Sequence, residues 1–203
     1  GDFRSQECIN YLIDSDIVVT NPPFSKFTEL FSLITKYDKQ YLLISNQNAI
    51  TYKEIFPYIK NNKARVGYHF GDMAFRVPDD TEPRKTRFWV DEFGQKWRSL
   101  GNAMWLTNLE VSNDSGKKLV LTHSFKEENY PKYDNFDAVH VYRVSEIPMD
   151  YYGIMGVPLT YLKYHNDKMF EIVGEANHGS DNEYDLFKPQ INGKETFKRI
   201  LIQ

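Results

Sequence analysis

The first half of the chain alternates short apolar runs with amphipathic segments. Residues 16–20, DIVVT, form a β-branched run that ends at a Pro-Pro turn, which predicts a buried strand. Residues 41–44 and 66–70 predict two further strands. Residues 51–60 predict a helix, because Thr51 and Glu54 have the spacing of a capping box. Another helix is predicted directly after the Pro-Pro turn by apolar residues at helical spacing: Phe24, Phe27, Phe31 and Ile34.

This order of strand, helix, strand, helix and strand predicts an α/β fold built on a parallel sheet with right-handed crossovers. From residue 71 the pattern changes to aromatic and charged residues without clear periodicity. A run of roughly thirty such residues is long for a mere linker. Residues 103–109 predict a strand that returns to the sheet. Four later strand-like runs follow, at residues 119–122, 138–144, 170–173 and 200–202. We therefore expect an α/β part over residues 1–110 and a β-rich part over residues 111–203.

Composition narrows the class of protein. The chain has 203 residues, 41% of them hydrophobic, which is enough for one core or for one core and a small appendage. No stretch approaches the ~18 apolar residues of a membrane span. A single cysteine, Cys8, excludes an internal disulfide and fits a cytoplasmic protein. The net charge of −3 argues only mildly against a nucleic-acid binder, since a local basic groove matters more than the total.

The sequence NPPF at residues 21–24 follows the first predicted strand, and in open α/β sheets ligands bind at such strand ends. The exocyclic amine of adenine is a poor nucleophile because its lone pair is delocalised into the ring. The Asn21 side-chain carbonyl and the Pro22 backbone carbonyl can each accept one N–H of that amine, and Phe24 can stack on the base. The electrophile implied is a sulfonium methyl group. A base inside a duplex would have to be flipped out to reach this turn.

Longer segments of the sequence carry a more specific resemblance. "GDFRSQECINYLIDSDIVVTNPPFSKF", "ISNQNAITYKEIFP", "GDMAFRVPDD", "KTRFW", "QKWRSLGNAMWLTNL" and "YPKYDNFDAV" together resemble the EcoRI-type adenine-specific DNA methyltransferase family, and the similarity runs over the whole chain. The resemblance implies S-adenosylmethionine as the cofactor, double-stranded DNA as the partner and methylated adenine as the product. It also implies a restriction-modification context and an S-adenosylmethionine-dependent, Rossmann-like sheet, followed by a target-recognition portion.

The resemblance also assigns roles to individual residues. Asn21, Pro22, Pro23 and Phe24 match the family's catalytic motif. Asp2 and Phe3 match a pair that binds the adenine of the cofactor, together with Asn21; the carboxylate accepts the adenine amine and the ring stacks on it. No metal site is implied.

The flipped adenine and the DNA backbone have their own candidate residues. Phe75 stands where related enzymes place a second aromatic face for the flipped base, with Phe70 and Trp89 as rivals and the hydrophobic core as another place for its ring. A basic run interleaved with aromatic residues fits either a surface that follows phosphates or a solvated loop over packed tryptophans. Its basic members are Arg84, Lys85, Arg87, Lys96 and Arg98.

One departure from the family pattern concerns the start of the chain. The family's glycine-rich cofactor loop and its ribose-binding acid belong upstream of Gly-Asp-Phe, and the sequence begins at Gly1. We therefore expect a fragment without most of the methyl-donor pocket that is inactive alone. We also expect it to self-associate through an uncovered sheet edge or apolar face.

Other interpretations of the motifs stay open. The Pro-Pro turn can be only a strand terminator. The carboxylates of Asp72, Asp79, Asp80 and Glu82 near Lys85 could form a metal-dependent nuclease site. NPPF-type motifs also serve enzymes that methylate a glutamine amide in a protein, and the chain could be a DNA-binding module without catalysis.

Overall fold

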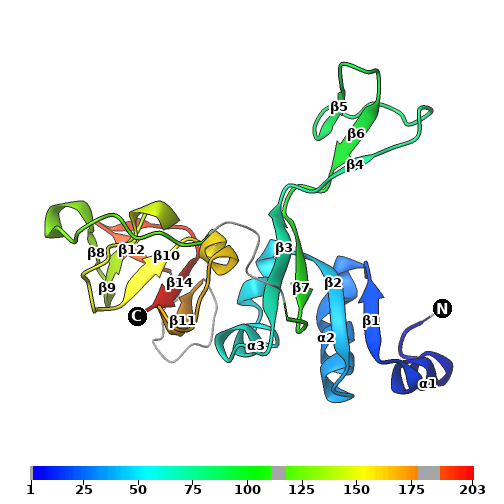
Figure 1. Cartoon of the computed structure of the whole chain (residues 1–203), viewed down its shortest axis with the longest axis horizontal. Coiled ribbons are helices and arrows are strands. Elements are labelled where there is room, and N and C mark those ends of the chain that lie inside the picture. Colours follow the sequence, from blue (N-terminus) through cyan, green and yellow to red (C-terminus); the bar gives the residue numbers. More distant parts are fainter. Residues whose placement is uncertain (1, 111–117, 178–187) are drawn as a thin grey trace. The chain divides into compact units, whose positions relative to one another are not determined.

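A computed structural model describes residues 2–110, 118–177 and 188–203, and the chain forms two compact units (Figure 1). The first unit comprises Gly1–Ala49 and Ala64–Glu110, and the second comprises Ile50–Lys63 and Val111–Gln203. The chain therefore leaves the first unit after the second strand of its sheet and returns to it for the third. In the described ranges, no helix is long and apolar enough to cross a membrane.

The first unit is built on a four-stranded mixed sheet. Its strands are β1 (Ile17–Thr20), β2 (Gln40–Asn46), β3 (Arg65–Gly71) and β7 (Ala103–Thr107), in the order β1-β2-β7-β3. β1 and β2 are parallel, as expected, whereas β7 is antiparallel to both β2 and β3. β3 therefore runs in the same direction as β1 and β2, as the predicted order of strands and helices implies, and the sheet is mixed because β7 runs against them. The chain returns from β3 with Gly71 paired to Ala103, and a return to the neighbouring position in this way makes the strands antiparallel.

β1 is an edge strand rather than the buried strand that its sequence predicts. It pairs with β2 alone among the described strands, and its side chains alternate between exposed and half-buried. Val19 is 61% exposed and Ile17 is 39% exposed. In the described chain, the β-branched run therefore forms a strand with one unpaired edge. Self-association through this edge remains a prediction.

Two helices flank the NPPF turn along the chain. α1 (Gln6–Asp14), which the sequence pattern did not reveal, begins at Ser5, whose hydroxyl accepts the Cys8 N–H at 3.3 Å. After the turn, the short helix η1 (Phe24–Lys26) leads into α2 (Phe27–Lys36). The predicted apolar face is confirmed for Phe27, Phe31 and Ile34, which are buried, but not for Phe24, which lies in η1 and is 43% exposed. The Phe31 ring meets Tyr41 of β2 edge-on at 5.6 Å, which fixes α2 against the sheet.

The helix predicted over residues 51–60 is much shorter. η2 (Gln47–Thr51) precedes an irregular stretch, and α3 (Phe56–Lys60) begins only at Phe56, with Pro57 in its first turn. The capping-box prediction is wrong because the Thr51 hydroxyl has other partners. It accepts hydrogen bonds from Asn177 Nδ2 and Lys198 Nζ, both at 3.1 Å. Pro57 lacks an N–H and favours a first-turn position, so it sets where the helix starts.

A separate small sheet is inserted between β3 and β7 (Figure 1). It consists of β4 (Ala74–Arg76), β5 (Phe88–Val90) and β6 (Lys96–Ser99), in the order β4-β6-β5. We call residues 72–101 the inserted sheet. Trp89 and Trp97 stack across β5 and β6 with their ring centroids 6.4 Å apart. The expectation that this region is more than a linker is therefore confirmed.

The second unit is β-rich, as expected. Its main sheet has the order β11-β14-β10-β9-β8. These strands are β8 (Lys132–Tyr133), β9 (Phe136–His140), β10 (Met155–Val157), β11 (Ile172–Ala176) and β14 (Arg199–Ile202). β12 (Gln190–Ile191) and β13 (Lys194–Glu195) form a small hairpin, and three short helices are η3 (Glu127–Asn129), η4 (Val144–Glu146) and η5 (Leu159–Lys163). The predicted strand at residues 119–122 is wrong, because that segment is irregular up to a single bridge between His123 and Pro148.

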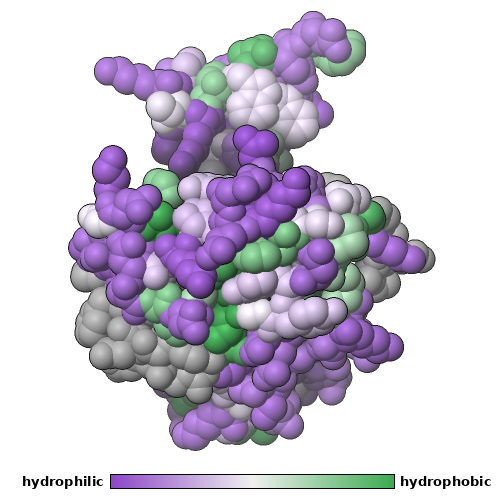
Figure 2. Space-filling view, turned by 90° about the vertical axis from the view of Figure 1, so that its left-hand side faces the viewer, coloured by the Kyte–Doolittle hydropathy of each residue, from purple (hydrophilic) through white to green (hydrophobic). Residues whose placement is uncertain are grey.

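The surface of the second unit is mixed in character. Figure 2 shows hydrophobic residues scattered among hydrophilic ones on the face that it presents. Among the described residues of this unit, Tyr152 and Phe197 are the most exposed large apolar side chains, each at 85%. Isolated apolar residues of this kind are ordinary on protein surfaces, so they identify no site by themselves.

A buried polar network joins three strands of the second unit. His140 of β9 is only 1% exposed; its Nδ1 lies 2.8 Å from Tyr133 Oη, and its Nε2 lies 3.2 Å from Arg199 Nη2. Because Arg199 can only donate, Nε2 accepts and the imidazole is neutral. Burial, and secondarily the Arg199 charge, lower the pKa of His140 from 6.5 to about 4. The network therefore requires an uncharged histidine.

This histidine should make stability depend on pH. The folded-state pKa lies below the unfolded value, so the unfolded chain binds more protons between these two pKa values. Stability is therefore full above pH ~6.5 and falls by about 1–3 kcal/mol as the pH drops toward 4. Urea unfolding of the parent and of His140→Gln, measured at several pH values, checks this. Equal pH slopes for the two proteins would contradict the prediction.

Candidate active site and nucleic-acid interface

The NPPF turn leaves the carboxyl end of β1 and leads directly into η1 and α2. Thr20 pairs with Leu43, so residues 44–46 of β2 extend beyond the last paired residue of β1. Pro22 is buried, whereas Asn21 and Pro23 are exposed and Phe24 is 43% exposed. The two prolines fix the backbone at this point. The turn therefore presents an amide side chain and an aromatic ring on a rigid support.

The carbonyl groups of the turn differ in whether they accept a hydrogen bond within the described chain. The Pro23 carbonyl accepts the Lys26 N–H at 2.9 Å, which closes η1. In the part of the chain that the structure describes, neither the Asn21 side chain nor the Pro22 carbonyl forms a hydrogen bond. The catalytic prediction needs these two groups as acceptors for a substrate amine. Both are available.

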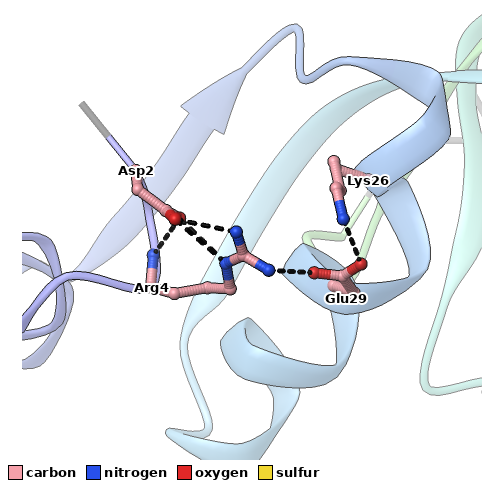
Figure 3. A network of polar contacts seen from close by, with 4 residues as sticks. All are labelled: Asp2, Arg4, Lys26 and Glu29. Carbon is pink, nitrogen blue, oxygen red and sulfur yellow. Dashed lines mark hydrogen bonds and ion pairs between the residues drawn. The ribbon is translucent and has the colours of Figure 1, made fainter.

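Asp2 lies in a network of charged groups (Figure 3). Its carboxylate accepts hydrogen bonds from Arg4 Nη2 at 2.8 Å and from Arg4 Nε at 3.0 Å. These bonds from Arg4 are the main reason why the pKa of Asp2 falls to about 2. Arg4 Nη1 also donates to Glu29 at 3.2 Å, and Glu29 accepts from Lys26 Nζ at 2.8 Å. The network joins the start of the chain to the helix that follows the NPPF turn.

Sequence reasoning singled out neither Arg4 nor the Lys26–Glu29 pair. The pair has the i,i+3 spacing of a helical ion pair, which is the one local signal that could have indicated it. All four side chains are partly exposed, so the ion pairs contribute modestly to stability. Their effect is to orient the Asp2 carboxylate.

The predicted partner of Asp2 faces a different environment. Phe3 lines a cavity of about 390 Å³ formed with residues of α1, β1 and α2. Most of its lining is apolar and includes Leu12, Val18 and Leu33. Asp2 is not among the residues that line this cavity, because its carboxylate is turned to Arg4.

A second cavity, of about 510 Å³, lies on the inserted sheet. Three of the predicted substrate-binding residues line it, namely Phe75, Arg84 and Arg87, and Arg98 of the same basic run joins them. Lys85 is exposed but is not among the residues that line this cavity. Lys96 is used within the fold, because its Nζ donates to the Asp79 carbonyl and, at 3.0 Å, to the Thr81 carbonyl.

Phe70 and Trp89, the two alternatives to Phe75, do not line this cavity. Phe70 is only 4% exposed, so its ring belongs to the core of the first unit. Trp89 is opposite Trp97, whereas Phe75 is opposite Arg98, and neighbouring residues of β6 point to opposite faces. The open choice between core and surface for Phe75 is thereby resolved, since its ring is 44% exposed.

The carboxylates of the nuclease interpretation do not gather. In the described residues, no group of three or more His, Cys, Asp or Glu side chains could hold a metal ion. Asp72 instead accepts the Gly101 N–H at 2.8 Å and closes the base of the inserted sheet.

The prediction about Asp2 can be tested through its proton affinity. In Arg4→Ala the carboxylate loses its principal donor, so the pKa of Asp2 should rise from about 2 toward the ordinary value. Carbon-detected NMR titration of the carboxyl group measures this. Lys26→Ala serves as the matched control and should raise the pKa less, because Lys26 acts only at longer range. An unchanged titration of Asp2 in Arg4→Ala would show that the network does not hold the carboxylate.

A mixed α/β fold with an Asn-Pro-Pro-Phe turn at a strand end points to the amino-methyltransferases as a class. The chain belongs to the family of the adenine-specific methyltransferase EcoRI, whose model matches residues 1–203.

Three curated relatives agree with this membership. The chain is 47% identical to the type II methyltransferase M.EcoRI of Escherichia coli, over all of the chain and 62% of that protein. It is 39% identical to M.MgeORF184P of Mycoplasma genitalium and 37% identical to M.MpnI of Mycoplasma pneumoniae, in each case over 85% of the chain and 56% of the relative. The chain thus spans less than two thirds of each relative. No solved structure gave a significant match.

Proposed function

We propose that the protein is a DNA adenine-N6 methyltransferase that uses S-adenosylmethionine and acts on an adenine flipped out of double-stranded DNA. The observation that carries the proposal is the exposed turn at the end of β1, where the Asn21 side chain and the Pro22 carbonyl form no hydrogen bond within the described chain. Membership of an adenine-specific family selects adenine as the substrate base. Because the relatives are type II methyltransferases, we also propose a restriction-modification context.

The two carbonyl groups act on the amine of the substrate. Each accepts one N–H, which favours the pyramidal form of the nitrogen and directs its lone pair away from the ring. S-Adenosylmethionine supplies an electrophilic methyl group. The lone pair of the nitrogen would take up this methyl group as the carbon–sulfur electrons stay with sulfur, and the methylated nitrogen would release one proton to water. Asn21 and Pro22 stabilise the positive charge that develops on the nitrogen, so no charged base is required.

The cofactor is assigned to Asp2, Phe3 and Asn21. Asp2 stays ionised throughout the physiological range because its pKa is about 2. The two carboxylate oxygens accept four contacts from Arg4, so an adenine amine would take the place of one of them. The apolar cavity beside Phe3 suits the flat face of the base.

DNA is assigned to Phe24 and to the inserted sheet. Phe24 is exposed beside Asn21 and is suited to stack on the flipped adenine. Phe75, Arg84, Lys85 and Arg87 are proposed to contact the DNA strand. Residues 111–203 are proposed as the target-recognition portion, and the location as the cytoplasm.

The sheet is proposed to be part of a Rossmann-like methyltransferase sheet. The support is the parallel β1–β2 pair, connected through α2, with the NPPF turn at the carboxyl end of β1. In open α/β sheets this is the edge at which ligands bind.

A tritiated-methyl assay on adenine-containing duplex DNA tests the function. The protein is made both as residues 1–203 and as the whole reading frame that encodes them. We expect transfer to the adenine amine by the whole product. The same assay is run on residues 1–203. Transfer to a glutamine-containing protein but not to DNA, or DNA binding without any transfer, would overturn the proposal in favour of the alternatives.

A further inference from the structure

The cavity on the inserted sheet has an unusual balance of charge. Residues 72–101 contain the cations Arg76, Arg84, Lys85, Arg87, Lys96 and Arg98 and the carboxylates Asp72, Asp79, Asp80, Glu82, Asp91 and Glu92. The inserted sheet as a whole is therefore neutral. Its cavity is lined by three arginines and by no carboxylate. Three of the six cations are thus grouped in the lining without a carboxylate, as an anion-binding site requires.

Arg87 is held in place by an uncommon backbone conformation. Its φ is 58°, in the left-handed region that residues other than glycine rarely adopt. Its guanidinium lies against Gly101, where an added Cβ would come within 2.2 Å of Arg87 Cζ. Arg87 Nη1 donates to the Leu100 carbonyl at 3.2 Å, and the Arg87 carbonyl accepts the Ser99 N–H at 3.1 Å. Backbone strain of this kind persists only where surrounding contacts maintain it, and strained residues are concentrated at functional sites.

The cavity also offers an aromatic face. Phe75 of β4 lies opposite Arg98 of β6, and residues in register share one face of a sheet. The stacked tryptophans and Arg76 belong to the other face, where Arg76 lies near the carboxylate of Asp91. One face of the inserted sheet therefore combines arginines with a partly exposed ring.

We propose that this cavity binds one unstacked nucleotide of a DNA strand, with its phosphate on Arg84, Arg87 and Arg98 and its base on Phe75. The planar guanidinium fork of arginine matches a phosphate, and an aromatic face stacks on any base. The ring of Phe75 can reach the face of a base only if that base has left the duplex stack. The volume of about 510 Å³ falls within the ~300–1,000 Å³ of small-ligand sites.

The assignment deepens the proposed function and rests on it for the identity of the polymer. A flipped adenine leaves neighbouring and opposite nucleotides without their stacking partners. A second nucleotide site, separate from the NPPF turn, would hold one of these in place.

Binding of a fluorescein-labelled single-stranded DNA pentamer to the full chain, followed by anisotropy at several salt concentrations, tests the proposal. Arg87→Ala and Arg98→Ala should each weaken binding about 10-fold and reduce the salt slope by no more than about 0.7, the value for the one phosphate that the arginines share. Phe75→Ala should weaken binding at least about 5-fold without changing the slope. Arg98→Lys should keep the slope while it restores only part of the affinity.

Arg76→Ala is the matched control, since it removes the same charge from the opposite face and should leave affinity and slope unchanged. Thermal unfolding verifies that each variant is folded. If Phe75→Ala binds like the parent while the arginine variants weaken, the site takes phosphate only and the nucleotide assignment is wrong. If all four variants bind like the parent, the cavity is not a DNA site. Because the readout is binding, either result is distinct from a failure of methyl transfer.

Discussion

Asn21→Ala is expected to lower kcat for methyl transfer by about 100-fold or more, while affinity for duplex DNA changes little. The side-chain carbonyl acts mainly when the nitrogen becomes pyramidal and positive, so its removal raises the barrier without removing ground-state contacts to DNA. In the described structure this side chain supports no other group, so its loss should not disturb the turn. Single-turnover transfer and filter binding separate these two quantities.

Two further asparagine variants sharpen this experiment. Asn10→Ala removes an exposed asparagine of α1 and should behave like the parent. Asn21→Asp retains an acceptor and should keep more activity than Asn21→Ala. A parallel loss of DNA affinity in Asn21→Ala would contradict a role confined to the transition state.

Phe24→Ala should lower kcat/KM for DNA by about 5- to 150-fold, the range that ~1–3 kcal/mol of lost base stacking implies. Phe24 is 43% exposed, whereas Phe27, the next phenylalanine of the same segment, is 2% exposed and packs in the core. Truncation at residue 24 should therefore cost little stability, so the fall in kcat/KM would come from lost contact with the DNA base. Phe24→Trp, which retains an aromatic face, should restore most of kcat/KM. Kinetics of Phe24→Ala equal to those of the parent would remove Phe24 from the site.

Local sequence pattern was sufficient where one segment determines its own structure. The buried face of α2 follows from the spacing of Phe27, Phe31 and Ile34, and the NPPF turn follows from its prolines. The sequence pattern was insufficient where contacts between residues far apart in the sequence determine the structure. The antiparallel direction of β7 depends on its pairing with two strands, and the Thr51 hydroxyl is engaged by Asn177 and Lys198 rather than by its own helix.

The candidate site shows the same division. Asn21, Pro22 and Phe24 could be named from their order along the chain. The basic run at residues 84–98 could also be named. The sequence did not show which of its members line the cavity and which are bound within the fold. Cross-strand register places Arg98 beside Phe75, while the Lys96 ammonium is engaged by backbone carbonyls. Register is a property of pairing between segments, so no single segment reveals it.

The direct pairing of Gly71 with Ala103 has an evolutionary consequence. Everything between these two residues enters and leaves the four-stranded sheet at one point, so a two-residue hairpin turn could join β3 to β7 in its place. An insertion attached in this way can lengthen, shorten or be exchanged without moving β1, the strand that precedes Asn21. Members of the family could therefore acquire new DNA contacts through this segment while the chemistry stays constant.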